Sequence, residues 1–96
     1  MDSIEFLDNE FILLHRVVGK NVAKIRKMKK VTQLDLSLSI GYNSTSVIAK
    51  AEAGTEGRHF SVEQLYKIAK ILNVPMSCFF ENKCGIQIGS SLIKLT

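Results

Sequence analysis

The chain has 96 residues, 46% of them hydrophobic and 23% charged, which suits one small globular domain with a single modest core. Its 13 Lys and Arg exceed its 9 Asp and Glu, so its net charge is +4. No apolar stretch is long enough for a signal sequence or a membrane span, and the two cysteines have neither CxxC spacing nor histidine neighbours. We therefore expect a cytoplasmic protein without a metal site.

The first ten residues form an acidic extension. Four acids and no base lie there, whereas all 13 Lys and Arg and five acids follow, so the net charge from residue 11 onward is 13 − 5 = +8. A basic domain is expected of a protein that neutralises phosphates, although charge of this size also fits an ordinary soluble domain. We divide the chain into an extension (1–10), a domain (11–81) and a C-terminal tail (82–96).

A helical period predicts the first helix from residue 8 or 9 to about residue 30. Val18, Val22 and Ile25 recur on one face, and Met28 is expected to extend this apolar stripe. The lysines on the remaining surface fit a solvated face or contact with a DNA backbone, and we favour a mixture of the two.

Residues 31–41 predict a second helix against their local pattern. Thr32 is a good N-cap, Gln33 follows at the positive helix end, and Gly41 can supply the positive φ that ends the helix. Alternation of apolar and polar residues is by itself typical of a strand, but these end signals outweigh it. The alternating apolar residues are Leu34, Leu36, Leu38 and Ile40. In a helix Leu36 and Ile40 face the core. Leu34 and Leu38 lie on another face, which needs another cover.

A cap signal at Asn43 and Ser44 predicts a third, short helix from Thr45 to Ala53. Its first turn carries small polar side chains, which suit the floor of a DNA major groove. Two short helices joined by a turn after Gly41 are typical of a helix-turn-helix.

The fourth helix is predicted to start at Ser61 and a fifth at Pro75. Their expected core residues are Leu65, Ile68, Ala69 and Leu72, followed by Met76, Phe79 and Phe80. The tail alternates apolar and polar residues around a Gly-Ser-Ser turn, which is a weak strand or hairpin signal.

The order and spacing of these segments resemble the Cro/repressor (xenobiotic-response-element) helix-turn-helix family of bacterial and phage transcription regulators. The residues that carry the resemblance are Thr32-Gln33, Leu36, Ile40-Gly41, Ile48, Ala51-Glu52 and Gly54. The resemblance covers about residues 16–81 and implies an all-α, five-helix, lambda-repressor-like DNA-binding domain. It also implies a structural ion pair between Arg26 and Glu52, and a homodimer on a pseudo-palindromic operator in double-stranded DNA.

Spacing places a DNA-facing surface at the start of the second and third helices, and the loop before the fourth helix is expected to add phosphate contacts. The residues expected to contact DNA are Thr32, Gln33, Asn43, Ser44, Thr45, Ser46, Lys50, Arg58 and His59. No cofactor or small-molecule ligand is expected.

We therefore expect the function to be sequence-specific transcriptional control, with repression favoured over activation. One alternative is a protein-interaction module or antitoxin component with the same fold. An enzyme is not expected, because no nucleophile, base and pocket are brought together by any motif. The apolar residues of the extension are expected to pack on the chain's own domain, and the tail is expected to pair with a second subunit.

Overall fold

A computed structural model describes residues 4–81, so the predicted strand in the tail lies outside the described residues. The α-helices are α1 (Asp8–Met28), α2 (Gln33–Ser39), α3 (Ser46–Ala53) and α4 (Val62–Leu72). Two 3₁₀-helices follow α3 and α4, namely η1 (Thr55–Gly57) and η2 (Met76–Phe80). Between residues 4 and 81 there is no strand, and none of the helices is long and apolar enough to cross a membrane. The described domain is therefore all-α.

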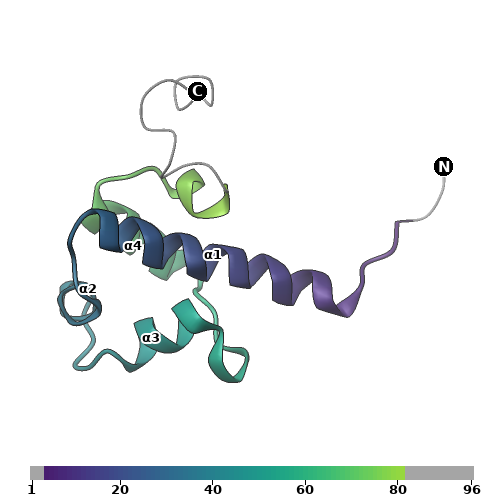
Figure 1. The fold of residues 1–96 in the computed structure, drawn as a ribbon, viewed down its shortest axis with the longest axis horizontal. Coiled ribbons are helices and arrows are strands. Elements are labelled where there is room, and N and C mark those ends of the chain that lie inside the picture. The colour runs from purple at the N-terminus through teal and green to yellow at the C-terminus, as the bar shows by residue number, and fades with distance from the viewer. Residues whose placement is uncertain (1–3, 82–96) are drawn as a thin grey trace.

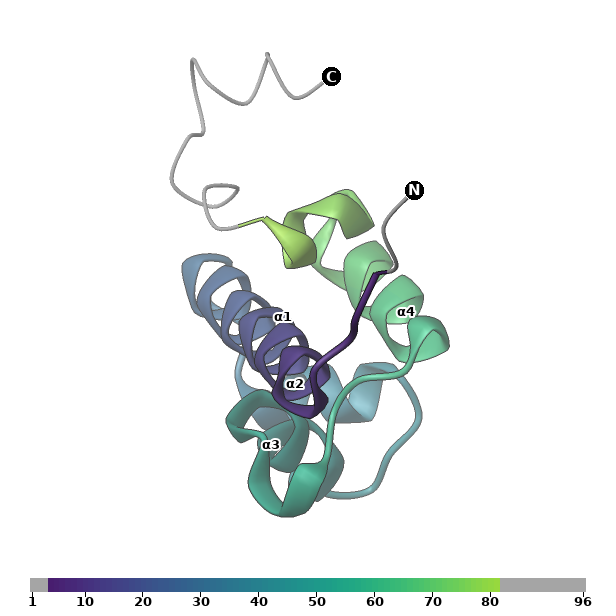
Figure 2. The same cartoon turned by 90° about the vertical axis from the view of Figure 1, so that its right-hand side faces the viewer.

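The long helix α1 is the centre of the architecture (Figure 1). It packs against α3 on one side and against η2 on the other, while α2 contacts both α3 and α4. Turned by 90°, the molecule shows α1 and α4 with α3 below them (Figure 2). The two helices of the helix-turn-helix thus lie at one edge of the molecule, held by α1 and α4.

One core joins all these elements. Its buried apolar residues are Val18, Val22, Ile25, Leu36, Ile48, Ala51, Phe60, Leu65, Ile68, Ala69, Leu72, Cys78 and Phe79. The predicted stripes of the first and fourth helices are therefore confirmed. Met28, however, is 45% exposed, because it is the last residue of α1 and lies beyond the turns that pack on the core.

The short helix predicted after Pro75 is the 3₁₀-helix η2, so the structure has four α-helices between residues 4 and 81 and the predicted count of five is not confirmed. Helix η2 spans only five residues after the extended Pro75, and the amide of Cys78 donates to the carbonyl of Pro75 at 3.1 Å, a bond over three residues. With three residues per turn, neighbouring side chains diverge widely. Phe79 is fully buried, whereas Phe80 is 48% exposed and does not fill the core as predicted.

The helical prediction for residues 33–39 is confirmed despite the strand-like alternation. The hydroxyl of Thr32 accepts a hydrogen bond from the amide of Asp35 at 3.0 Å, and Gly41 has φ 102°. Leu36 is fully buried, while Leu34 and Leu38 are 46% and 54% exposed. Within the described residues, the second face of α2 therefore stays open.

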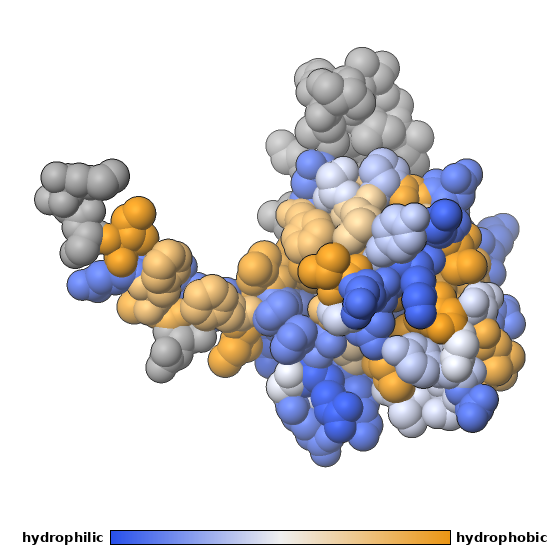
Figure 3. Space-filling view, turned by 180° about the vertical axis from the view of Figure 1, so that it is seen from behind, coloured by the Kyte–Doolittle hydropathy of each residue, from blue (hydrophilic) through white to orange (hydrophobic). Residues whose placement is uncertain are grey.

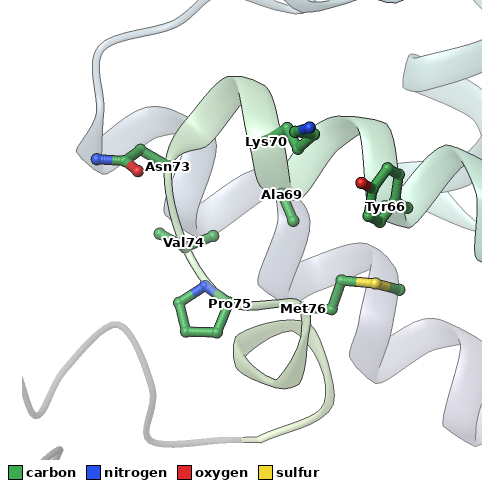
Figure 4. Close-up of a pocket in the computed structure, with 7 residues that line it drawn as sticks. All are labelled: Tyr66, Ala69, Lys70, Asn73, Val74, Pro75 and Met76. Atoms are coloured by element: carbon green, nitrogen blue, oxygen red, sulfur yellow. The ribbon is translucent and has the colours of Figure 1, made fainter.

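Helix α4 is fixed at both ends. Ser61 and Gln64 form a capping box, and the Gln64 amide also donates to the Tyr42 hydroxyl at 2.8 Å, which ties the turn after α2 to α4. At the other end Asn73 adopts a left-handed conformation, and the chain turns into η2 through Pro75 (Figure 4).

Residues 4–14, which we call the N-terminal arm, project from the body (Figure 1). The prediction that the extension packs on its own domain is wrong for the described part, because Ile4, Phe6 and Phe11 are 72%, 69% and 52% exposed. The reason is that α1 begins at Asp8 and carries the arm beyond the core, away from the open face of α2.

Candidate nucleic-acid interface

An ion pair joins α1 to α3 at the base of the candidate interface. The guanidinium of Arg26 donates to both carboxylate oxygens of Glu52, with Nε–Oε2 2.8 Å and Nη2–Oε1 3.0 Å, and its Nη1 donates to the Val31 carbonyl at 2.9 Å. The two side chains are only 7% and 6% exposed. This bidentate pair, expected from the family resemblance, fixes the end of α3 against α1 and the loop before α2.

Gln33 belongs to the same network. Its Nε2 donates to Glu52 Oε1 at 2.9 Å, so the first residue of α2 is tied to the end of α3. The two helices of the helix-turn-helix are therefore linked by a side-chain contact as well as by packing. The amide oxygen of Gln33 takes no part in this contact with Glu52.

A glycine brings α1 and α3 into close contact. A Cβ added at Gly19 would lie 2.7 Å from the carbonyl oxygen of Ala51 and 2.8 Å from that of Glu52. Backbone atoms cannot yield as a flexible side chain can, so this position accepts only glycine at the present helix spacing. The contact holds α3 close to α1 next to the ion pair.

The first turn of α3 presents small polar groups to solvent. Asn43, Ser44 and Ser46 are exposed, and Thr45 is half-buried at the N-cap position. The cap signal was predicted one or two residues early: Thr45 is the cap residue, and the Ser44 hydroxyl accepts a long bond of 3.4 Å from the Ser46 amide. The small side chains leave this turn accessible to the edges of bases.

Lys50 lies one turn further along α3 and is paired with an acid that the sequence reading did not single out. Its Nζ is 3.7 Å from Glu56 Oε1, and both side chains are largely open to solvent, at 42% and 65%. Glu56 reaches back because the chain reverses at η1, where Glu56 has φ 57° and Gly57 has φ 73°. An exposed pair of this kind is weak, so Lys50 can exchange its partner for a phosphate.

Arg58 and His59 follow η1 and are exposed. The His59 ring stacks on His15 of α1, with centroids 3.8 Å apart and planes 18° apart. Burial, and secondarily the neighbouring His59, lower the pKa of His15 below its ordinary value. The same place forms a hollow that also contains Arg16 and Gly54, so α1 and the loop after η1 bring basic groups together beside the end of α3.

Another hollow lies between α4 and η2, away from this basic cluster (Figure 4). Lys70 is the one charged side chain in its lining, and its Nζ lies 5.5 Å from the ring centroid of Tyr66. Across residues 4–81, no group of three or more His, Cys, Asp or Glu is placed to hold a metal ion. The described surface offers hydroxyls, amides and cations, which can bind a polyanion through charge and hydrogen bonds.

Some parts of the site were visible in the sequence and others were not. The residues predicted to contact DNA lie on the capped ends of α2 and α3, on α3 itself and in the loop after η1. His15, Arg16 and Glu56 were missed as neighbours of that surface, because their partners are set by tertiary packing. The double role of Gln33 also depends on Glu52, a residue 19 positions away.

A comparison with protein-family models matches residues 22–77 to a family described as helix-turn-helix. The match runs from the middle of α1 into η2, so it covers the ion pair, α2, α3 and the loop that carries Arg58 and His59. A search of curated proteins found no relative.

Proposed function

The chain belongs to the helix-turn-helix family of Cro/C1 type, and we propose that it regulates transcription by binding a specific DNA sequence. In this proposal residues 11–81 are the DNA-binding unit, residues 1–10 are an acidic extension and residues 82–96 are a tail. The observation that carries the proposal is the network of Arg26, Glu52 and Gln33, because it holds both helices of the motif in one fixed relation before any DNA is bound.

We assign the base contacts to the first turn of α3. Asn43, Ser44, Thr45 and Ser46 present short polar side chains at the start of a helix, the end that enters the major groove in helix-turn-helix proteins. Thr32 and the amide oxygen of Gln33, at the start of α2, are assigned to the adjacent backbone.

Phosphate contacts are assigned to Lys50, Arg58 and His59. All three lie on α3 or just after η1, and Arg16 lies beside them. Contacts from basic side chains to phosphates carry no sequence information, but they fix the position of a protein on the duplex. They also give the binding affinity a strong dependence on salt concentration.

One such unit meets only a few base pairs, so we propose that two copies bind a pseudo-palindromic operator with half-sites about one helical turn apart. A dimer seated on an operator excludes other proteins from the same DNA, which supports repression as the mode of control. No ligand or cofactor is required by this mechanism.

The experiment compares variants on duplexes selected from a random DNA pool by the wild-type protein. Thr45→Ala should change the preferred bases, because a base contact accounts for about 1–3 kcal/mol of discrimination. Lys50→Ala should weaken binding to every sequence and lower the salt slope by about one unit.

Glu56→Gln is the matched variant for Lys50, because it removes the carboxylate that competes for the ammonium. It should strengthen binding to all sequences equally. Lys67→Ala, an exposed lysine of α4, serves as the control for loss of one positive charge elsewhere. If Thr45→Ala and Lys50→Ala both bind like the wild type, the assigned surface is wrong.

A further inference from the structure

The N-terminal arm carries the most exposed apolar surface of the described chain. Its large apolar residues, each between 47% and 72% exposed, are Ile4, Phe6, Leu7, Phe11, Ile12, Leu13 and Leu14. Figure 3 shows them gathered along the segment that projects from the body. We propose that the arm is the contact surface for a second copy of this chain, packed antiparallel to the first.

The apolar residues of the arm surround the helix. Four of them, residues 11–14, are consecutive, and successive side chains of an α-helix are about 100° apart, so they point in nearly every direction. A helix that is apolar all round is stable in water only when it is buried. A flat partner would cover one stripe, whereas a second arm, with its helix and its extended residues 4–7, can cover more than one side.

The exposed stripe also continues the face that builds the core. Phe11 and Leu14 precede Val18 and Val22 at spacings of three and four residues, so all four share one face of α1. The chain's own core covers Val18 and Val22 but leaves Phe11 and Leu14 half-exposed. The same face is therefore used twice, for the core in its second half and for a partner in its first half. Because α1 is one continuous helix, such a dimer is rigidly connected to α3.

The charges along α1 favour an identical partner in antiparallel orientation. Glu5 and Glu10 lie in the arm, whereas Arg16, Lys20 and Lys24 follow it, and all five are exposed. Antiparallel packing places the acidic end of each copy beside the basic stretch of the other, and parallel packing would place like charges together. A second copy therefore supplies the complementary charge as well as the apolar cover.

The amount of surface is sufficient for a stable contact. Seven large side chains that are about half exposed offer roughly 700 Å² per chain, close to the ~800 Å² per partner of an ordinary specific interface.

The test uses the full chain without DNA, so that it can fail while the proposed DNA binding stands. Sedimentation from about 1 to 100 µM compares the wild type with the double variant Phe11→Gln/Leu14→Gln. We expect a wild-type dimer and association weakened at least about tenfold in the double variant, because both substitutions place an amide in a buried contact. The double variant should keep the helical circular dichroism of the wild type at the lowest concentration, since both side chains are half-exposed in one chain and lie outside its core.

Val62→Gln is the control, because Val62 is 71% exposed on α4, outside the arm. It should associate like the wild type. A wild-type protein that stays monomeric throughout this range, or a double variant that dimerises as well as the wild type, would overturn the proposal. Dissociation on deletion of residues 82–96, together with an unaffected double variant, would assign the interface to the tail instead.

Orientation is tested by photo-crosslinking with benzoylphenylalanine in place of Phe6, in a mixture of heavy- and light-isotope chains. Antiparallel packing predicts crosslinks from residue 6 of one chain to residues 15–24 of the other. Crosslinks confined to the first ten residues of the partner would contradict the arrangement.

Discussion

Replacement of Glu52 by alanine should destabilise the domain before it alters DNA recognition. The Arg26 side chain is only 7% exposed, and in this variant its guanidinium keeps the Val31 carbonyl as its remaining partner of the network. The variant also removes the carboxylate that accepts the hydrogen bond from Gln33. Loss of one member of a buried pair typically costs about 3–5 kcal/mol. For a domain whose total stability is about 5–15 kcal/mol, that is a large fraction.

Thermal unfolding followed by circular dichroism measures this effect. For a domain of this size each kcal/mol shifts the melting temperature by about 4–8 °C, so Glu52→Ala should melt at least about 12 °C below the wild type. Glu63→Ala removes an exposed acid in the first turn of α4 and should stay within a few degrees of the wild type. Base preference, measured at a temperature where Glu52→Ala is folded, should be unchanged.

A Glu52→Ala protein that melts together with the wild type would refute the reasoning, because the pair would then contribute nothing despite its burial. A changed base preference in the folded variant would show that Glu52 acts in recognition as well as in structure.

Three further outcomes follow from packing and charge. Gly19→Ala should cost about 1–3 kcal/mol in denaturant unfolding, because its Cβ meets two backbone carbonyls at 2.7 and 2.8 Å; wild-type stability would show that α1 and α3 are not so close. Phe79→Ala should cost about 3–5 kcal/mol and Phe80→Ala less than about 1, since the first is fully buried and the second 48% exposed; equal losses would contradict this difference in burial. The lowered pKa of His15 means that the folded chain binds fewer protons than the unfolded chain, so the free energy of unfolding should decrease as pH falls through about 6.5. His15→Gln should remove this part of the pH dependence, and an unchanged dependence of the free energy of unfolding on pH would exclude His15 as its source.

Much of the fold could be predicted from end signals and helical period. Thr32, Gly41 and Ser61 mark helix ends through chemistry that acts over a few residues, and so α2 was predicted correctly although its apolar residues alternate like those of a strand. The buried stripes of α1 and α4 follow from spacing in the same way.

The predictions that failed did so for separate physical reasons. Phe79 and Phe80 were both expected to fill the core, but adjacent side chains of a helix point in different directions, and Phe79 is buried while Phe80 is half-exposed. Apolar residues in the N-terminal extension showed that a cover is needed, but sequence does not say whether the chain itself or another molecule provides it. The stack of His15 on His59 depends on packing between elements that are distant in sequence.

Selection from a random duplex pool, followed by a salt titration, tests the proposed sequence-specific DNA binding. We expect enrichment of a pseudo-palindromic site, binding to that site at least about a thousandfold tighter than to a scrambled duplex, and a logarithm of affinity that falls linearly with the logarithm of salt concentration. A pool without enrichment, or equal affinity for the selected and scrambled duplexes, would contradict it.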